Sequence, residues 1–113
     1  MKNNSFVIPF NYFFDRIIND YKYHHQLKIT NITDVSFDIE GYNGKYNVII
    51  TIANNILNVV LNKTTIRDDG SLYMETTATK NFNLLEFLIS NSCTILEIKD
   101  YVYDFIYNKV EEH

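Results

Sequence analysis

Two asparagine-containing dipeptides, Asn43-Gly44 and Asn54-Asn55, interrupt a stretch of the chain in which apolar and polar residues alternate. Asn-Gly is the strongest short-range signal for a β-hairpin, because a two-residue type I′ turn needs a positive φ at both central positions. Glycine adopts that conformation freely and asparagine tolerates it, so Asn-Asn is a weaker version of the same signal. The two dipeptides therefore predict three consecutive antiparallel strands.

The pairing across the two predicted turns places apolar residues opposite apolar residues. Across the first turn the expected pairs are Val35 with Ile52, Phe37 with Ile50, and Ile39 with Val48. Across the second turn the expected pairs are Val48 with Leu61, Ile50 with Val59, and Ile52 with Leu57. A slip of one residue in either turn would send one apolar set to solvent, because side chains alternate between the two faces of a strand. The agreement between the turns predicts a sheet with one buried face.

A fourth strand is predicted over residues 71–80, after the turn signal Asp68-Asp69-Gly70. Its alternation separates two sets of side chains, with Leu72, Met74 and Ala78 on one side and Tyr73, Glu75, Thr77 and Thr79 on the other. If Asp69-Gly70 is a two-residue turn, Leu61 faces Ala78 on the inside and Asn62 faces Thr77 on the outside. A wider loop from Thr64 to Gly70 is the alternative.

Helices are predicted before and after the sheet. Before it, Pro9 marks a helix start, and apolar residues recur at helical spacing until the pattern decays at about His25: Phe10, Phe13, Phe14, Ile17, Ile18 and Tyr21. After it, Asn83 with Glu86 resembles a capping box, and Thr94 with Glu97 repeats that signature after a predicted break at Ser90-Asn91-Ser92. The expected core stripe of the last helix is Ile95, Ile98, Val102, Phe105 and Ile106.

These elements predict an α+β fold in two layers. A four-stranded antiparallel meander carries the N-terminal helix and the C-terminal helices on one face, and its other face lies in water. The 113 residues suit a single α+β domain spanning 1–113, since 46% of them are hydrophobic and only 3 are Gly and 1 is Pro.

Charge and cysteine content bound the expected partners and compartment. The net charge of -4 and the pI of about 5.2 disfavour direct binding to nucleic acid or to an anionic membrane, which both depend on clustered Lys and Arg. The single cysteine, Cys93, cannot form an internal disulfide, and no signal-peptide pattern opens the chain. We expect a cytoplasmic protein, in the host cell cytoplasm if the source is viral.

No catalytic, cofactor-binding or metal-ligating constellation is apparent. The sequence has no glycine-rich phosphate loop, no Gly-x-Ser-x-Gly elbow and no Cys-x-x-Cys pair. His24 and His25 are adjacent, so on a helix they point about 100° apart and cannot both bind one metal ion. Cys93 has no nearby His and is expected to be a structural thiol. We expect no enzyme, no cofactor and no metal.

The predicted outer face supplies candidate protein-binding residues. Ile49 and Val60 pair on this face beside Asp38, as an apolar pair with an acidic flank, and two interpretations stay open: strand propensity or a partner surface. Asp34, Asp38 and Glu40 form a carboxylate stripe on the predicted edge strand. The stripe either prevents edge-to-edge pairing with another sheet or binds the Lys and Arg side chains of a basic protein. The candidates are Asp34, Asp38, Glu40, Ile49, Val60, Asn62, Tyr73 and Glu75.

The pattern favours a small acidic non-enzymatic binding protein that inhibits or modulates another macromolecule. Its partner would be another protein. A nucleic-acid-binding protein is one candidate, because such a protein has a basic surface. At the level of fold alone, such a chain is similar to toxin-immunity proteins, to viral or phage inhibitors of host defence and to secretion chaperones. The alternatives are a homodimer or other self-assembly through the outer face or the Tyr103 and Tyr107 side of the last helix, and a small-ligand or enzyme site assembled only in three dimensions.

Overall fold

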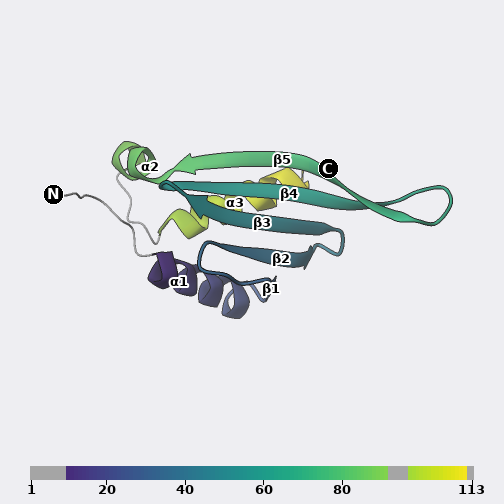
Figure 1. Ribbon diagram of the computed structural model, residues 1–113, viewed down its shortest axis with the longest axis horizontal. Helices are drawn as coiled ribbons and strands as arrows, with labels where there is room; N and C mark the ends of the chain where they lie inside the picture. Colours follow the sequence, from purple (N-terminus) through teal and green to yellow (C-terminus); the bar gives the residue numbers. More distant parts are fainter. Residues whose placement is uncertain (1–9, 92–96, 112–113) are drawn as a thin grey trace.

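The computed structural model describes residues 10–91 and 97–111 (Figure 1). Within these residues the helices are α1 (Phe10–Tyr23), α2 (Leu84–Asn91) and α3 (Ile98–Glu111). The strands are β1 (Lys28–Thr30), β2 (Ser36–Tyr42), β3 (Tyr46–Ala53), β4 (Ile56–Ile66) and β5 (Leu72–Asn83). The fold is α+β: along the chain, an N-terminal helix comes first, an antiparallel sheet follows, and two helices come last.

The sheet has five strands in the order of the sequence, β1-β2-β3-β4-β5. The meander is therefore as predicted, but the predicted number of four strands is wrong. The additional strand, β1, is three residues long, and its central Ile29 pairs with Ile39 of β2. In Figure 1, α3 passes behind β3 and β4, and no described helix crosses the near face of these strands.

The predicted register of the three central strands is confirmed. Five of the six expected pairs are cross-strand neighbours with buried side chains: Phe37 with Ile50, Ile39 with Val48, Ile50 with Val59, Val48 with Leu61, and Ile52 with Leu57. At the second turn, Asn54 and Asn55 have φ of 52° and 62°, and Ala53 pairs with Ile56 directly beside them. Both turns thus select the same buried face.

The first turn carries a bulge that the sequence did not reveal. Asn43 and Gly44 have the expected positive φ of 53° and 79°, but the pairing shifts by one residue between Ile39 and the Tyr42–Tyr46 pair. Glu40 therefore does not pair with Asn47, as continuing the pairing of Ile39 with Val48 would require. The extra residue at the bulge is accommodated by Gly41, whose N–H donates to the side-chain oxygen of Asn47 at 3.0 Å.

Val35 does not lie in the core as predicted, since its side chain is 50% exposed. Strand β2 begins one residue later, at Ser36, because the chain turns just before it. The N–H of Thr33 donates to the carbonyl of Ser36 at 2.8 Å and closes this turn. Only the backbone of Val35 joins the sheet, where its carbonyl accepts from the N–H of Ile52 at 2.9 Å.

A bulge at Thr77 changes the faces of β5. Leu61 pairs with Ala78 as predicted, but Asn62 pairs with Thr76 and not with Thr77. The loop is wider than a two-residue turn: the N–H of Arg67 bonds to the carbonyl of Ser71 at 2.8 Å. The pairing set by this loop differs by one residue from the pairing in the body of the sheet, and the bulge absorbs the difference.

The helices begin and end close to the predicted positions. Asn83 caps α2, because its side-chain oxygen accepts from the N–H of Glu86 at 3.2 Å. The predicted break is wrong in part, since Ser90 and Asn91 belong to α2. Some predicted features lie outside the described residues, namely Pro9, Ser92, Cys93, the Thr94 cap and Ile95.

The core lies between the covered face of the sheet and the helices. Phe14 and Tyr21 of α1 both contact Phe37 edge-on, with ring centroids 5.2 and 6.4 Å apart. Ile98, Val102, Phe105 and Ile106 follow the predicted stripe of α3, with Phe105 only half-buried. The sheet and all three helices contribute further core residues: Ile17, Ile18, Tyr46, Ile52, Leu57, Phe82, Leu84 and Val110.

The outer parts of β4 and β5 form a two-stranded arm that projects beyond the other strands (Figure 1). We define the arm as residues 62–76, from the bulge to the Asp68-Asp69-Gly70 loop and back. The molecule measures 59 × 26 × 26 Å, and the arm lies along the longest direction. None of the described helices is long and apolar enough to cross a membrane.

Candidate binding surface on the open face of the sheet

The face of the sheet opposite the core is covered mainly by amide and hydroxyl side chains. The strand register assigns the following residues to it: Ser36, Asp38, Asn47, Ile49, Thr51, Asn58, Val60, Asn62, Thr76, Thr79 and Asn81. We call this set the open face. Two cross-strand bonds order its amides, from Asn58 to Asn81 and from Thr76 to Asn62. Such a face presents many uncharged donors and acceptors to a partner.

Ile49 and Val60 form the predicted apolar pair at the centre of the open face. Both side chains are half-buried, and Asp38 pairs with Ile49 from the neighbouring strand. Asn62, also predicted as a binding residue, lies on the same face, one step along β4. Ile49, Val60, Asp38 and Asn62 are therefore brought together as expected.

The predicted acidic edge is not an edge, because β1 pairs with β2. Lys28 of β1 forms an ion pair with Glu40 at 2.8 Å, and Asn31 donates to the carboxylate of Asp38 at 2.7 Å. Asp34 lies in the exposed loop before β2. The three carboxylates therefore do not form one continuous stripe: Glu40 is paired with a cation, Asp38 accepts from an amide, and Asp34 lies in a loop.

Tyr73 and Glu75 lie on the opposite side of the arm from the one predicted. Their partners in β4, Thr65 and Lys63, continue the covered face, because the bulge at Thr77 reverses the alternation of β5. Tyr73 contacts the guanidinium of Arg67, whose central carbon is 4.6 Å from the ring centroid. These two predicted residues are therefore separated from the open face.

The same reversal brings an exposed apolar group to the open side of the arm. Ile66, Leu72 and Met74 are 69%, 66% and 50% exposed, and Ile66 pairs directly with Leu72. The amide of Asn47 contacts the sulfur of Met74 at 3.8 Å, which joins the arm to the open face. We call these three side chains the arm patch. Sequence reasoning missed it because it assigned Leu72 and Met74 to the buried side.

The arm patch and the Ile49–Val60 pair form one elongated strip. Val60 and Ile66 are six residues apart on the same strand and face, which corresponds to about 20 Å at the usual rise per residue. The polar side chains of Asn62 and Thr64 lie between them. Apolar side chains set among hydrogen-bonding groups also occur in surfaces through which proteins contact one another.

A second polar group lies between α1 and α3. The carboxylate of Asp20 contacts His24 at 2.6 Å, His25 at 3.7 Å and Lys99 at 3.7 Å. Lys99 also contacts Asp100 at 3.2 Å. Lys99 of α3 thus lies between the carboxylates of Asp20 and Asp100, and its contact with Asp20 joins the two helices.

The aromatic rings beside this group form a stack. The ring of His25 lies parallel to that of Tyr103, with centroids 4.0 Å apart, and Tyr42 contacts Tyr103 edge-on. Burial raises the pKa of Tyr42 far above its ordinary value, and a hydrogen bond with Tyr103 adds to the shift. Burial also raises the pKa of Tyr21, with a further contribution from the charge of Asp20. Tyr21 and Tyr42 therefore stay neutral well into the alkaline range.

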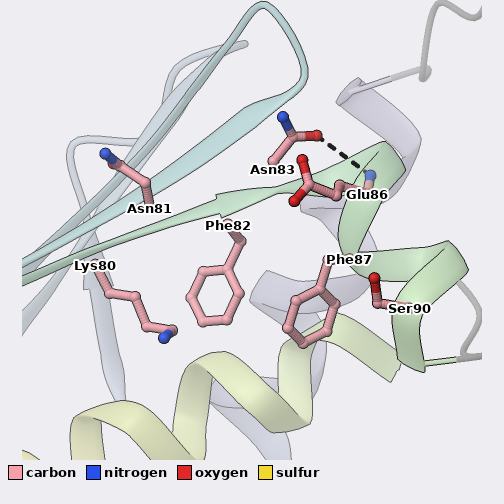
Figure 2. Close-up of a pocket in the computed structure, with 7 residues that line it drawn as sticks. All are labelled: Lys80, Asn81, Phe82, Asn83, Glu86, Phe87 and Ser90. Atoms are coloured by element: carbon pink, nitrogen blue, oxygen red, sulfur yellow. Dashed lines mark hydrogen bonds between the residues drawn. The ribbon is translucent and has the colours of Figure 1, made fainter.

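A shallow pocket of about 260 Å³ lies where β5 continues into α2 (Figure 2). Figure 2 shows Lys80, Phe82 and Phe87 pointing to the α3 side, whereas Asn81 points the other way. The ammonium of Lys80 lies 5.3 Å from the ring centroid of Phe82. This pocket combines a helix cap, an exposed cation and core aromatic rings, all of which have structural partners.

Apart from Tyr21 and Tyr46, the described residues contain no buried side chain with a polar or charged group, and they contain no group of three or more His, Cys, Asp and Glu placed to hold a metal ion. Besides Tyr21 and Tyr42, the described residue with a shifted pKa is Asp69. Hydrogen bonds from the side chain and the backbone of Ser71 lower the pKa of its carboxyl group. Asp69 is fully exposed in the loop of the arm, where these bonds order the turn.

Comparisons with family models, with curated proteins and with solved structures found no match to this chain. The open face and the arm patch are therefore interpreted from their own chemistry.

Proposed function

We propose that this chain is a small non-enzymatic binding protein that contacts another protein through the open face and the arm patch. The observation that carries the proposal is the arm patch, whose three apolar side chains are at least half exposed and continue the open face. Exposed apolar side chains that cluster at one place favour a contact surface, whereas isolated ones need no explanation.

The chemistry of the surface favours a neutral or basic partner. The open face offers amides and hydroxyls, and Asp34, Asp38 and Glu40 lie at its β2 side. The whole chain has a net charge of -4, which would attract a basic protein over distance and speed the encounter. An inhibitor, an immunity protein or an anti-defence protein that blocks a nucleic-acid-binding surface would have this character.

The same proposal places the protein in the cytoplasm. The chain has a single cysteine, which is typical of a reducing compartment. We also propose that the protein is not an enzyme. In support, the titratable groups with shifted pKa in the described residues are two tyrosines within the helix-side packing and one exposed loop carboxylate.

The proposal is tested by site-specific photo-crosslinking in extracts of the cells that produce the protein. A photoreactive phenylalanine analogue replaces Met74 on the open side of the arm in one variant, and Tyr73 on the opposite side in the matched control. Because the two positions are adjacent in sequence but face opposite ways, we expect one discrete heavier adduct from the Met74 variant and much less from the Tyr73 variant.

The adduct is identified by mass spectrometry and its partner is then purified. The Met74→Asp variant should bind that partner at least about tenfold more weakly, because a desolvated anchor of a contact surface contributes about 2 kcal/mol or more and about 1.4 kcal/mol is already tenfold. Equal crosslinking from both sides, or full affinity after Met74→Asp, would contradict the proposal.

A further inference from the structure

The outer edge of β5 is a long unpaired strand edge. In the sheet order, β5 is the last strand and pairs with β4 along its inner edge. It runs for 12 residues, and among the described residues no strand pairs with its other edge. Figure 1 shows this edge free along most of its length, with α2 at its end. The opposite edge strand, β1, has only three residues.

Long edges are usually protected against pairing, most often by charged side chains. β5 carries two charged side chains, Glu75 and Lys80, and both are exposed. Their charges are opposite, so they do not form a barrier of one sign. When two copies of this strand pair, some alignments place like charges opposite each other and repel, whereas another places Glu75 opposite Lys80 and attracts.

The bulge determines which alignment brings the two charges together on one side. Lys80 pairs with Val59, and Glu75 pairs with Lys63, so both charged residues belong to the side of β5 that continues the covered face. Without the extra residue Thr77, positions five apart would lie on opposite sides of the strand. With it, they share a side, and opposite residues in an antiparallel pair must share a side.

We propose that two copies of this chain pair antiparallel along β5, with a two-fold axis between Thr77 and Ala78. In this alignment Glu75 of each copy lies opposite Lys80 of the other, which gives two ion pairs by symmetry. On the other face, Thr76 of each copy lies opposite Thr79 of the other. The two sheets then form one continuous sheet with the helices of both copies on the same side.

The alternative alignments explain why this register is selected. Placing the axis at Glu75 sets the two Glu75 carboxylates against each other, and placing it at Lys80 does the same for the two ammonium groups. Like charges directly opposite each other destabilise an antiparallel pair, whereas opposite charges stabilise it. The strand also has Thr76, Thr77 and Thr79, which favour β pairing.

This dimer goes beyond the proposed function, because it uses the edge of β5 and leaves the side chains of the open face in solvent. The two open faces would lie side by side in one surface related by the two-fold axis. Such a surface is suited to a partner that is itself two-fold symmetric or repetitive, since the second contact then becomes intramolecular.

Charge reversal tests the register by sedimentation of the full chain at micromolar concentrations. We expect the wild-type chain to be a dimer. Glu75→Lys and Lys80→Glu should each raise the dimer dissociation constant at least about tenfold, because each turns both attractive pairs into repulsive ones. The double variant Glu75→Lys with Lys80→Glu should restore the dimer. Lys22→Glu, on the exposed surface of α1, is the matched control and should leave the dimer intact.

A disulfide test does not depend on the charged residues. In a Cys93→Ser background, Thr76→Cys together with Thr79→Cys should give a covalent dimer under mild oxidation, since each new thiol lies opposite the other in the second copy. Each single-cysteine variant faces a threonine and should crosslink far less. Thermal unfolding of every variant verifies that it is folded.

Three results would overturn the proposal. One is a wild-type chain that stays monomeric throughout the micromolar range. Another is a dimer that survives both single charge reversals, which would assign the contact to a different surface. The third is equal crosslinking of the single-cysteine and double-cysteine variants.

Discussion

The hydroxyl of Tyr21 on α1 donates a hydrogen bond of 2.7 Å to the backbone carbonyl of Lys99 on α3. Tyr21 is fully buried, and its ring contacts Phe37 of the sheet edge-on. One side chain therefore joins the first helix, the last helix and the sheet. The carbonyl of Lys99 lies in the first turn of α3, so this bond is additional to the one that the carbonyl accepts within the helix.

Tyr21→Phe should lower the free energy of unfolding by about 1 kcal/mol at neutral pH, because it removes this hydrogen bond. Burial raises the pKa of Tyr21 above its ordinary value of 10.0. Above that value the unfolded chain loses the proton first, so the contribution is full below about pH 10 and is lost as the pH rises.

Urea unfolding of both proteins at neutral pH and above about pH 10 measures this difference. The wild type should lose more stability than Tyr21→Phe over that interval, so the two values should converge. Tyr42 remains in both proteins and cancels in the comparison. Parallel pH profiles would show that Tyr21 is not the group that links stability to alkaline pH.

Phe37→Ala should lower the free energy of unfolding by about 3 to 5 kcal/mol, because it removes a fully buried ring and leaves a cavity. The matched control is Val35→Ala, two residues earlier on the chain. Its side chain is half exposed, so the cost should stay below about 1 kcal/mol. Urea unfolding checks both values, and similar costs for the two variants would mean that the core is not arranged as described.

Asn55 offers a test of the second turn. Its φ is 62°, so Asn55→Gly should be neutral or stabilise the protein by a few tenths of a kcal/mol, and Asn55→Ala should destabilise it by about 1 kcal/mol. The backbone bond from the N–H of Leu84 to the carbonyl of Asn55 remains in both variants. Thermal unfolding measures the order, and a more stable alanine variant would contradict the turn conformation.

Charge reversal at the β2 side of the open face should act on binding more than on folding. Asp38→Lys with Glu40→Lys breaks an ion pair that is largely exposed, so the free energy of unfolding should change by less than about 1 kcal/mol. Association with a basic partner should slow, and the difference from the wild type should shrink as salt is raised. Stopped-flow measurements at two salt concentrations test this, and an unchanged association rate would exclude these carboxylates from steering.

Val60→Asp should act on the opposite kinetic step. Val60 lies at the centre of the open face and is half-buried, so a carboxylate there should raise the dissociation rate with little dependence on salt. Surface plasmon resonance with the purified partner measures that rate. An unchanged dissociation rate would move the contact away from the centre of the face.

The central part of the fold could be predicted because its information is local. The turns at Asn43-Gly44 and Asn54-Asn55 each align two short strands, and the apolar pattern of β3 agrees with both. Strand β1 could not be predicted in the same way. It has three residues and one inward apolar side chain, Ile29, and it pairs through a loop that has no hairpin signal.

The candidate site was predicted only in its centre, where Ile49, Val60, Asp38 and Asn62 share the face as expected. The faces of the arm depend on whether the loop closes over two residues or three, and Asp68-Asp69-Gly70 fits either. A residue pattern cannot resolve this choice, because Thr76 and Thr77 are the same amino acid. The ion pair of Lys28 with Glu40 was hidden for a related reason, since it required β1.

The bulge at Thr77 separates the register of the arm from the register of the sheet. The body of β5 is held by the core, whereas the arm is aligned by its own loop. A change confined to that loop can therefore exchange Leu72 and Met74 for Tyr73 and Glu75 on the open side. No residue of the core would be altered, and in the open face Thr77 would take the place of Thr76. In evolution, the arm is thus a separable unit whose surface chemistry can be replaced in one step by an insertion or deletion at its tip.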